Sequence, residues 1–298
     1  MISVIIPAYK NTDLLLKNLK HNLPHLKNCE IIIVNDDPEK SIKKDLEPYP
    51  VVLIENKENL GFGGTANKGV EQAKSPYVML LNSDVILSDS SFKQCGDHFK
   101  KDNSLFAVTF AQQEKDGTIV GKNKFFFKRG LFFHKKADDL RFGQNAWAEG
   151  GTSLFDRNKF LELGGFDTIY KPFYWEDIDL SYRAKKHGYL VLFDPKIQVT
   201  HYHESTIGKY FSKKYVKEIA YRNQFIFIWK NITAPLLVFS HLIFFIPNLL
   251  YYALKNEPDY IKGYFDALKL FGEIMKKRAA QKKYHLQTDS EILSNVHE

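Results

Sequence analysis

Apolar and polar residues alternate in blocks along the first part of the chain. Four short runs rich in Val, Ile and Leu predict strands at Ile2–Ile6, Glu30–Val34, Val51–Ile54 and Tyr77–Leu81. Between them, residues 12–27, 39–47 and 63–74 have the pattern of helices. Strands that are apolar throughout and alternate with helices predict an α/β fold, with a mostly parallel central sheet flanked by helices.

Polar residues gather where the predicted strands end. The segments in question are Pro7-Ala8-Tyr9, Asn35-Asp36-Asp37, Glu55-Asn56 and Asn82-Ser83-Asp84. Because ligands of parallel sheets bind at the carboxyl ends of the strands, we expect a nucleotide there. Asp84 is suited to hold Mg²⁺ or Mn²⁺ against a diphosphate, although Asn-Ser-Asp is also common in turns.

Residues 111–147 interrupt this alternation with lysines among phenylalanines. The segment predicts either a functional loop or a β-hairpin with packed Phe and solvated Lys side chains. A second structured block follows, from Trp147 to about His203, and then a helical region. We therefore divide the chain into an α/β domain, 1–210, and a C-terminal helical region, 211–298, which is a candidate for membrane association or oligomerisation.

The net charge of +7 suits a phosphate-bearing ligand, an anionic membrane surface or nucleic acid. No nucleic-acid-binding signature accompanies it, so nucleic acid is not expected as a partner. Two cysteines without metal-type spacing favour a reducing, cytoplasmic compartment. The chain begins with a strand-like segment and not with the pattern of a signal peptide.

The run from Gly61 to Ala66 fits the pattern G-x-G-x-x-A of dinucleotide-binding proteins. That fingerprint normally follows the first strand, whereas this run follows the third. A helix that begins in glycines binds phosphate in either case, so we interpret Gly61, Gly63 and Asn67 as parts of a loop on the donor side.

Taken together, the motifs resemble family 2 glycosyltransferases, in particular the rhamnosyl- and galactofuranosyl-transferase branch. They are Val4–Tyr9, Ile33–Asp37, Asn59–Gly69, Leu80–Asp84, Glu149–Gly151, Gly164–Asp167 and Trp175–Arg183. The resemblance implies a GT-A fold with a Rossmann-like sheet. It also implies a nucleotide-sugar-binding half, 1–110, and an acceptor-binding half, 111–210.

The resemblance implies the following donor-binding residues: Pro7, Ala8, Tyr9, Asn35, Asp36, Gly61, Gly63, Asn67, Asn82, Ser83 and Asp84. Asp36 would accept a hydrogen bond from uracil or thymine, although the neighbouring Asn35 is an alternative. Asp84 would be the metal-binding acid of the DXD motif, and His201 would complete the metal shell. Asn82 departs from the motif, because its first position is usually an acid.

Trp175-Glu176-Asp177 begins a predicted helix. Acids in a first turn also serve as partners of the helix dipole, and Asp179 with Arg183 has the spacing of a surface ion pair. The resemblance implies that Asp177 is the general base of an inverting transfer, with Glu176 as the second candidate. Gly151, Trp175 and Glu176 would bind the acceptor.

The C-terminal region has two membrane-related features. Residues 232–254 are apolar for long enough to span a bilayer, but Pro235 and Pro247 interrupt them. A predicted final helix, 259–283, is basic and amphipathic, which is typical of binding to an anionic leaflet. A homodimer interface or packing on the catalytic domain would give the same pattern.

We therefore expect an inverting glycosyltransferase of cell-surface polysaccharide synthesis, peripheral on the cytoplasmic face of the membrane. Its donor would be a UDP- or dTDP-sugar, and its acceptor a glycan or a lipid-linked sugar. One alternative is a nucleotide-sugar pyrophosphorylase. Another is a non-catalytic, membrane-surface glycan-binding module, which Asn82 in place of an acid would favour.

Overall fold

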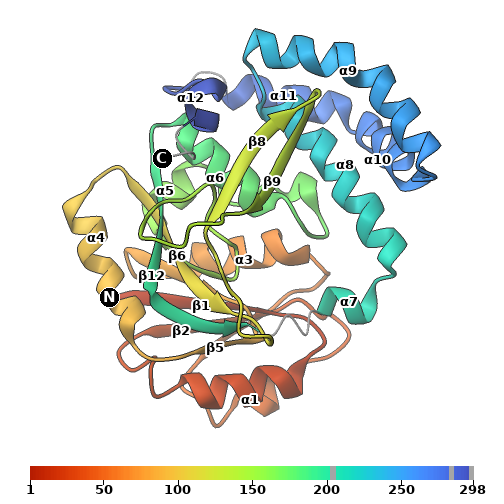
Figure 1. The fold of residues 1–298 in the computed structure, drawn as a ribbon. Helices are drawn as coiled ribbons and strands as arrows, with labels where there is room; N and C mark the ends of the chain where they lie inside the picture. The colour runs from red at the N-terminus through yellow and green to blue at the C-terminus, as the bar shows by residue number, and fades with distance from the viewer. Residues whose placement is uncertain (202–205, 282–284, 295–298) are drawn as a thin grey trace.

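The computed structural model describes residues 1–201, 206–281 and 285–294. The described residues form a ten-stranded sheet with the order β10-β12-β6-β11-β4-β1-β2-β3, to which β5 and β7 add at β12 and β6 (Figure 1). The parallel strands of its first half are β1 (Ile2–Ala8), β2 (Glu30–Asn35), β3 (Val52–Glu55) and β4 (Tyr77–Leu81). All four strands predicted from the apolar runs are thus confirmed.

Both faces of this half of the sheet are covered. In β1, Val4 and Ile6 pack in one buried cluster, whereas Ile5 between them packs in another. The helices on the first face are α1 (Thr12–Asn22), α2 (Lys43–Leu46) and α4 (Cys95–Lys101). Those on the second are α3 (Gly61–Gln72), α5 (Arg157–Glu162) and α6 (Glu176–Lys186). This double burial explains why the strands are apolar throughout.

The second half of the sheet mixes directions. Its strands are β5 (Val85–Leu87), β6 (Leu105–Gln113), β7 (Ile119–Val120), β10 (Gly143–Gln144), β11 (Thr152–Asp156) and β12 (Leu190–His201). β11 runs antiparallel to both β4 and β6, and β12 runs parallel to β6. β12 also pairs with β5, with His201 opposite Val85. This pairing brings the end of β12 beside the residues that follow β4.

The 111–147 segment contains the β-hairpin that was one of its two predicted alternatives. β8 (Asn123–Lys128) and β9 (Leu131–Lys136) form a separate two-stranded sheet. Phe125 and Phe132 are buried and contact each other at a centroid distance of 5.1 Å. The packed-Phe interpretation is therefore confirmed for these two residues.

Helices follow the sheet. They are α7 (Thr206–Tyr210), α8 (Lys213–Asn231), α9 (Pro235–Leu254), α10 (Pro258–Lys269), α11 (Phe271–Gln281) and α12 (Asp289–Ser294). The expected single helix over 259–283 is wrong, because the chain breaks at Leu270 between α10 and α11. Among the described residues, α9 is long and apolar enough by composition to cross a membrane.

The helix α10 packs closely on α8 at Gly263. A Cβ atom at this position would lie 2.7 Å from Cβ of Tyr221 and 2.8 Å from the backbone nitrogen of Arg222. Backbone atoms cannot move aside at low cost, so only glycine fits between the two helices. The contact holds α10 against α8.

We predict that Gly263→Ala lowers the free energy of unfolding by about 1–3 kcal/mol, because it overpacks this contact. Gly272→Ala is the matched control, since a Cβ there meets nothing within 4 Å. The control should leave stability unchanged or raise it by up to about 1 kcal/mol, because alanine favours helix. Urea unfolding measures both, and equal effects of the two substitutions would contradict the packing described.

Candidate active site

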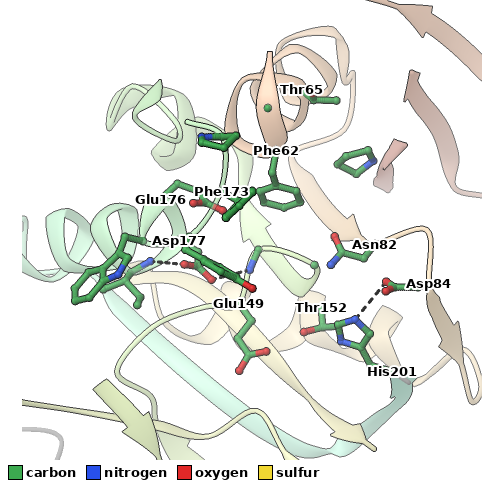
Figure 2. Close-up of a pocket in the computed structure, with 18 of the residues that line it drawn as sticks. Phe62, Thr65, Asn82, Asp84, Glu149, Thr152, Phe173, Glu176, Asp177 and His201 are labelled. Carbon is green, nitrogen blue, oxygen red and sulfur yellow. Dashed lines mark hydrogen bonds and ion pairs between the residues drawn. The ribbon is translucent and has the colours of Figure 1, made fainter. Parts of the chain in front are cut away.

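A cavity of about 910 Å³ opens at the carboxyl ends of β1, β2 and β4. Thirteen of the residues predicted to bind donor, acceptor or metal line it: Pro7, Ala8, Tyr9, Asp36, Gly61, Asn82, Ser83, Asp84, Gly151, Trp175, Glu176, Asp177 and His201. They come from both halves of the sheet and from α6. Figure 2 shows the acids of α6 and the end of β12 on different sides of the cavity.

Three predicted donor-binding residues are not in the cavity lining. The Asn35 amide donates to the backbone oxygen of Lys40 at 2.8 Å and accepts from the nitrogen of Asp37 at 3.1 Å. Gly63 lies against Phe166, which is 3.1 Å from where its Cβ would be. Asn67 makes two 2.8 Å hydrogen bonds to the backbone of Phe166. These residues hold loops around the cavity and are turned away from it.

Asp36 both lines the cavity and fixes the glycine loop. Its carboxylate accepts from the backbone nitrogens of Leu60 at 2.8 Å and Gly61 at 3.0 Å, and from Asn56 at 2.8 Å. Burial raises the pKa of Asp36, and these hydrogen bonds offset part of that shift. The side chain of Thr65 supplies a fourth hydrogen bond to this carboxylate.

Gly61 has φ +71°, and a Cβ there would lie 2.9 Å from the oxygen of Pro172. Glycine is needed here for both reasons. It lets the start of α3 approach the 170–175 loop, which carries the acceptor-side residues of the cavity.

Asp84 and His201 face each other across the β5–β12 pairing. Asp84 Oδ1 lies 3.2 Å from His201 Nε2, and His201 Nδ1 lies 2.8 Å from the side-chain oxygen of Gln112. The ring nitrogen Nδ1 is thus held by Gln112, and Nε2 faces Asp84. The described residues contain no group of three or more His, Cys, Asp or Glu that could hold a metal. The protein would thus supply two ligands, and a diphosphate and water the others.

Gly151 makes room for Asn82. A Cβ at Gly151 would lie 2.2 Å from the Asn82 side-chain nitrogen, and the Gly151 oxygen accepts from the Asn82 backbone nitrogen at 3.0 Å. Gly151, directly before β11, therefore lies against the residue that follows β4, and its predicted role in acceptor binding stays a prediction.

Asp177 lies in the cavity wall in the first turn of α6. Gly150 donates to its Oδ2 at 3.3 Å, and the backbone nitrogen of Ile178 lies 2.8 Å from its Oδ1. Removal from water raises the pKa of Asp177 to about 6, with a further contribution from the nearby negative charge of Glu149. A carboxylate with this pKa is poised to accept a proton near neutral pH.

Glu176 has a different environment. Its side chain is buried, and its Oε2 has no hydrogen-bond partner among the described residues. Burial, and secondarily the charge of Asp177, raises the pKa of Glu176 well above its ordinary value. The two adjacent acids therefore differ, because Glu176 retains its proton where Asp177 can lose one.

The loop before α6 is strained and held from α8. Tyr174 and Trp175 are consecutive non-glycine residues with φ of 70° and 77°. The Asn223 amide donates to the backbone oxygens of Tyr170, Phe173 and Tyr174 at 2.9, 3.0 and 2.8 Å. Left-handed backbone at such residues persists only where the surroundings enforce it. Asn223 thus stabilises the turn that places Glu176 and Asp177 in the wall of the cavity.

A buried ionic cluster anchors α6 one turn further on. Asp179 accepts from Arg183 at 2.7 Å and from Lys230 at 2.9 Å, and it also accepts from the Tyr170 hydroxyl at 2.8 Å. Burial alone would raise the pKa of Asp179, but Lys230 and Arg183 outweigh it and lower that pKa. The predicted Asp179–Arg183 pair is present, but the prediction that it lies on the surface is wrong, since both side chains are buried.

Sequence reasoning missed several cavity residues. Gln112 links His201 to the Glu149 carboxylate through its amide nitrogen, and Asn123 donates to the other oxygen of Glu149 at 3.0 Å. His134 on β9 makes edge contacts with Trp147 and Trp175 at about 5.2 and 5.1 Å. Glu149 stood inside a recognised motif, and Gln112 was a polar residue at the end of an apolar strand. His203, to which no role was assigned, lies outside the described residues.

The chain is similar in sequence to known proteins. A family model described as "Glycosyl transferase family 2" matches residues 3–164. The minor teichoic acid biosynthesis protein GgaB of Bacillus subtilis is 29% identical over 147 residues, which cover 45% of this chain and 16% of that one. An N-acetylglucosaminyl-diphospho-decaprenol L-rhamnosyltransferase of Mycobacterium tuberculosis is 36% identical over 63 residues, 21% of this chain and 20% of that one. The chain thus spans a fifth or less of the length of these two relatives.

Solved structures with the GT-A fold are similar in shape. S. aureus TarS 1-349 matches with a TM-score of 0.55 and 14% identity, covering 99% of this chain and 89% of that one. GalNAc-T7 with UDP, GalNAc and Mn²⁺ matches with a TM-score of 0.61 and 15% identity, covering 77% and 48%. At such identity the likeness shows the fold, and the predicted GT-A architecture is confirmed.

The buried cluster around Asp179 gives a testable prediction for stability. Lys230→Met keeps the length of the side chain but leaves Asp179 and Asp167 with less compensating charge, and we expect a loss of about 3–5 kcal/mol. Lys269→Met is the matched control, because Lys269 pairs with Asp266 on the surface, where ion pairs contribute little. Urea unfolding compares the two variants. A Lys230 variant as stable as the control would contradict a role for the cluster.

Proposed function

The chain belongs to glycosyltransferase family 2, and on that premise we propose that it is an inverting transferase that uses a UDP- or dTDP-sugar. The transferred sugar is a hexose or deoxyhexose, and the acceptor is a glycan or lipid-linked sugar of a cell-surface polysaccharide. One observation carries the proposal. A carboxylate poised to take a proton, Asp177, and a pair suited to a divalent cation, Asp84 with His201, line the same cavity.

The nucleoside lies along the ends of β1 and β2. Pro7, Ala8 and Tyr9 form one wall, and the carboxylate of Asp36, which lines the cavity, receives the N3–H of a uracil or thymine ring. The hydrogen bonds that Asp36 accepts from the glycine loop keep it fixed before the donor arrives. Because the pyrimidine ring has a single N–H in that position, one carboxylate oxygen suffices to recognise it.

The diphosphate lies at the end of β4, beside Asn82, Ser83 and Asp84. Asp84 and His201 would hold Mg²⁺ or Mn²⁺, which neutralises the diphosphate as it leaves. Two protein ligands leave most of an octahedral shell to phosphate oxygens and water, as Mg²⁺ prefers. Solved relatives bind Mn²⁺ together with UDP and GalNAc or with GDP-mannose. Gln112 keeps His201 in the tautomer that binds metal.

The reaction is a single displacement. Asp177 takes the proton from an acceptor hydroxyl as that oxygen bonds to the anomeric carbon, and the bond from that carbon to the diphosphate oxygen breaks on the opposite side. The electron pair of the broken bond stays on the diphosphate. Glu176, still protonated, donates a hydrogen bond to a sugar hydroxyl. Trp147, Trp175 and His134 provide an aromatic wall for the acceptor.

The proposed base predicts a pH dependence. Asp177 must be unprotonated to act, and its pKa is raised from 3.8 to about 6. The rate should therefore fall as the pH drops through about 6, and not only near 4. Glu149→Gln removes the nearby negative charge, which lowers the pKa of Asp177 and moves this limb to lower pH.

Release of nucleoside diphosphate, followed from pH 4.5 to 8, measures the pH profiles of the wild type and of Glu149→Gln. Asp177→Asn should lower kcat by about 10²–10⁴. Donor binding by this variant, measured by calorimetry, should stay close to that of the wild type. If Asp177→Asn retained full transfer, or if the limb did not move in Glu149→Gln, Asp177 would not be the base.

The proposed metal site predicts a separate effect. His201→Ala removes one of two ligands, so the Mn²⁺ concentration that supports half-maximal binding of UDP should rise about tenfold or more. His98→Ala is the matched control, because His98 forms a similar pair with Asp194 at 2.9 Å outside the cavity. Calorimetry of UDP binding against Mn²⁺ needs no turnover. Equal Mn²⁺ dependence of the two variants would remove His201 from the metal shell.

A further inference from the structure

The helix α9 exposes most of its large apolar side chains. Its two fully buried residues, His241 and Asn248, are polar, and its inward side also carries the partly buried Leu237, Val238, Leu249 and Tyr252. The large side chains that it exposes are Leu236, Phe239, Leu242, Ile243, Ile246, Leu250, Tyr251 and Leu254. A surface helix of a soluble protein shows the opposite pattern, with its apolar stripe turned inward. The outer face of α9 is therefore matched to an apolar medium.

Specific hydrogen bonds hold α9 in this orientation. His241 Nδ1 donates to the oxygen of Gly130 at 2.6 Å, while its Nε2 accepts from Trp229 at 3.0 Å. Asn248 donates to the oxygen of Arg129 at 2.9 Å. Both carbonyls belong to the turn of the β8–β9 hairpin, so the polar side of α9 is tied to the catalytic body (Figure 1). The exposed apolar face is thus built into the fold and does not result from loose packing.

The exposed face is long, uncharged and bordered by basic residues. None of the 20 residues of α9 is Asp, Glu, Lys or Arg, and Phe265 and Leu268 of α10 are also exposed. Lys128, Arg129 and Lys255 are exposed at the hairpin turn and at the end of α9. Between residues 213 and 281 there are eleven Lys and Arg against five Asp and Glu. An apolar stripe with a basic border is the pattern of proteins that lie on anionic membranes.

We propose that the outer face of α9 lies in the plane of an anionic lipid bilayer, at the boundary of headgroups and acyl chains. A second copy of the chain fits less well, because a two-fold contact through this face would bring the same basic border residues together. A membrane-spanning α9 fits less well too, because His241 and Asn248 bind the catalytic body along one side of the helix. The proposal does not depend on which sugar is transferred, and it replaces the final helix with α9 as the main membrane contact.

Flotation with phosphatidylcholine vesicles, with and without phosphatidylglycerol, tests the proposal on the full chain. We expect the protein to float with vesicles that contain phosphatidylglycerol, and less so at high salt. Ile243→Gln, Ile246→Gln and Leu250→Gln combined should weaken binding to the vesicles about tenfold or more, because three apolar side chains that would enter the bilayer are lost. The matched control combines Val52→Gln and Phe142→Gln, which are about as exposed but lie elsewhere. It should bind as the wild type does.

Thermal melting checks the triple variant, whose melting temperature should not fall, because the substituted side chains are exposed. Three results would overturn the proposal. The first is a wild-type protein that does not float with anionic vesicles. The second is a dimer in solution that the triple variant separates, which would assign the face to a second copy. The third is vesicle-bound protein that resists extraction by alkaline carbonate, which would indicate a spanning helix.

Discussion

The buried carboxylate of Asp179 is the interaction on which the site depends. It joins α6 to α8 through Lys230 and to the 170–175 loop through the Tyr170 hydroxyl. A buried charge is stable only with its partners in place, so these elements cannot move independently. Asp177 lies two residues earlier on the same helix, and its position in the cavity is therefore set by a cluster that takes no part in the chemistry. Asn223 adds to this by holding the strained turn at Trp175.

The same cavity gives different environments to residues of the same type. Glu176 is buried with an unpartnered oxygen, whereas Asp177 receives backbone hydrogen bonds and faces the cavity. This difference separates their pKa values and assigns them distinct proton states near neutral pH. Gln112 joins His201 to Glu149 through hydrogen bonds, and the charge of Glu149 in turn acts on Asp177.

Features that depend on residues close together in the chain could be predicted from the sequence, whereas features that depend on contacts between distant residues could not. The first four strands and the cavity at their ends were predictable, because apolar blocks and the polar residues after them are adjacent in the chain. The pairing of Gln112 with His201 was not, since it depends on the register of β6 and β12. The absence of Asn67 from the cavity lining could not be predicted either, because its side chain hydrogen-bonds to the backbone of Phe166, 99 residues away. The break at Leu270 was missed because apolar spacing continues across it.

The β8–β9 hairpin connects the two surfaces of functional interest. Its turn holds α9 through Gly130, and His134, four residues further on, lines the cavity, roughly 13 Å away at about 3.3 Å per residue. The central claim is a single displacement that Asp177 assists across this cavity. The anomeric configuration of the transferred sugar, determined by proton NMR before mutarotation, tests it most directly. We expect inversion relative to the donor, and a retained configuration would contradict a single displacement.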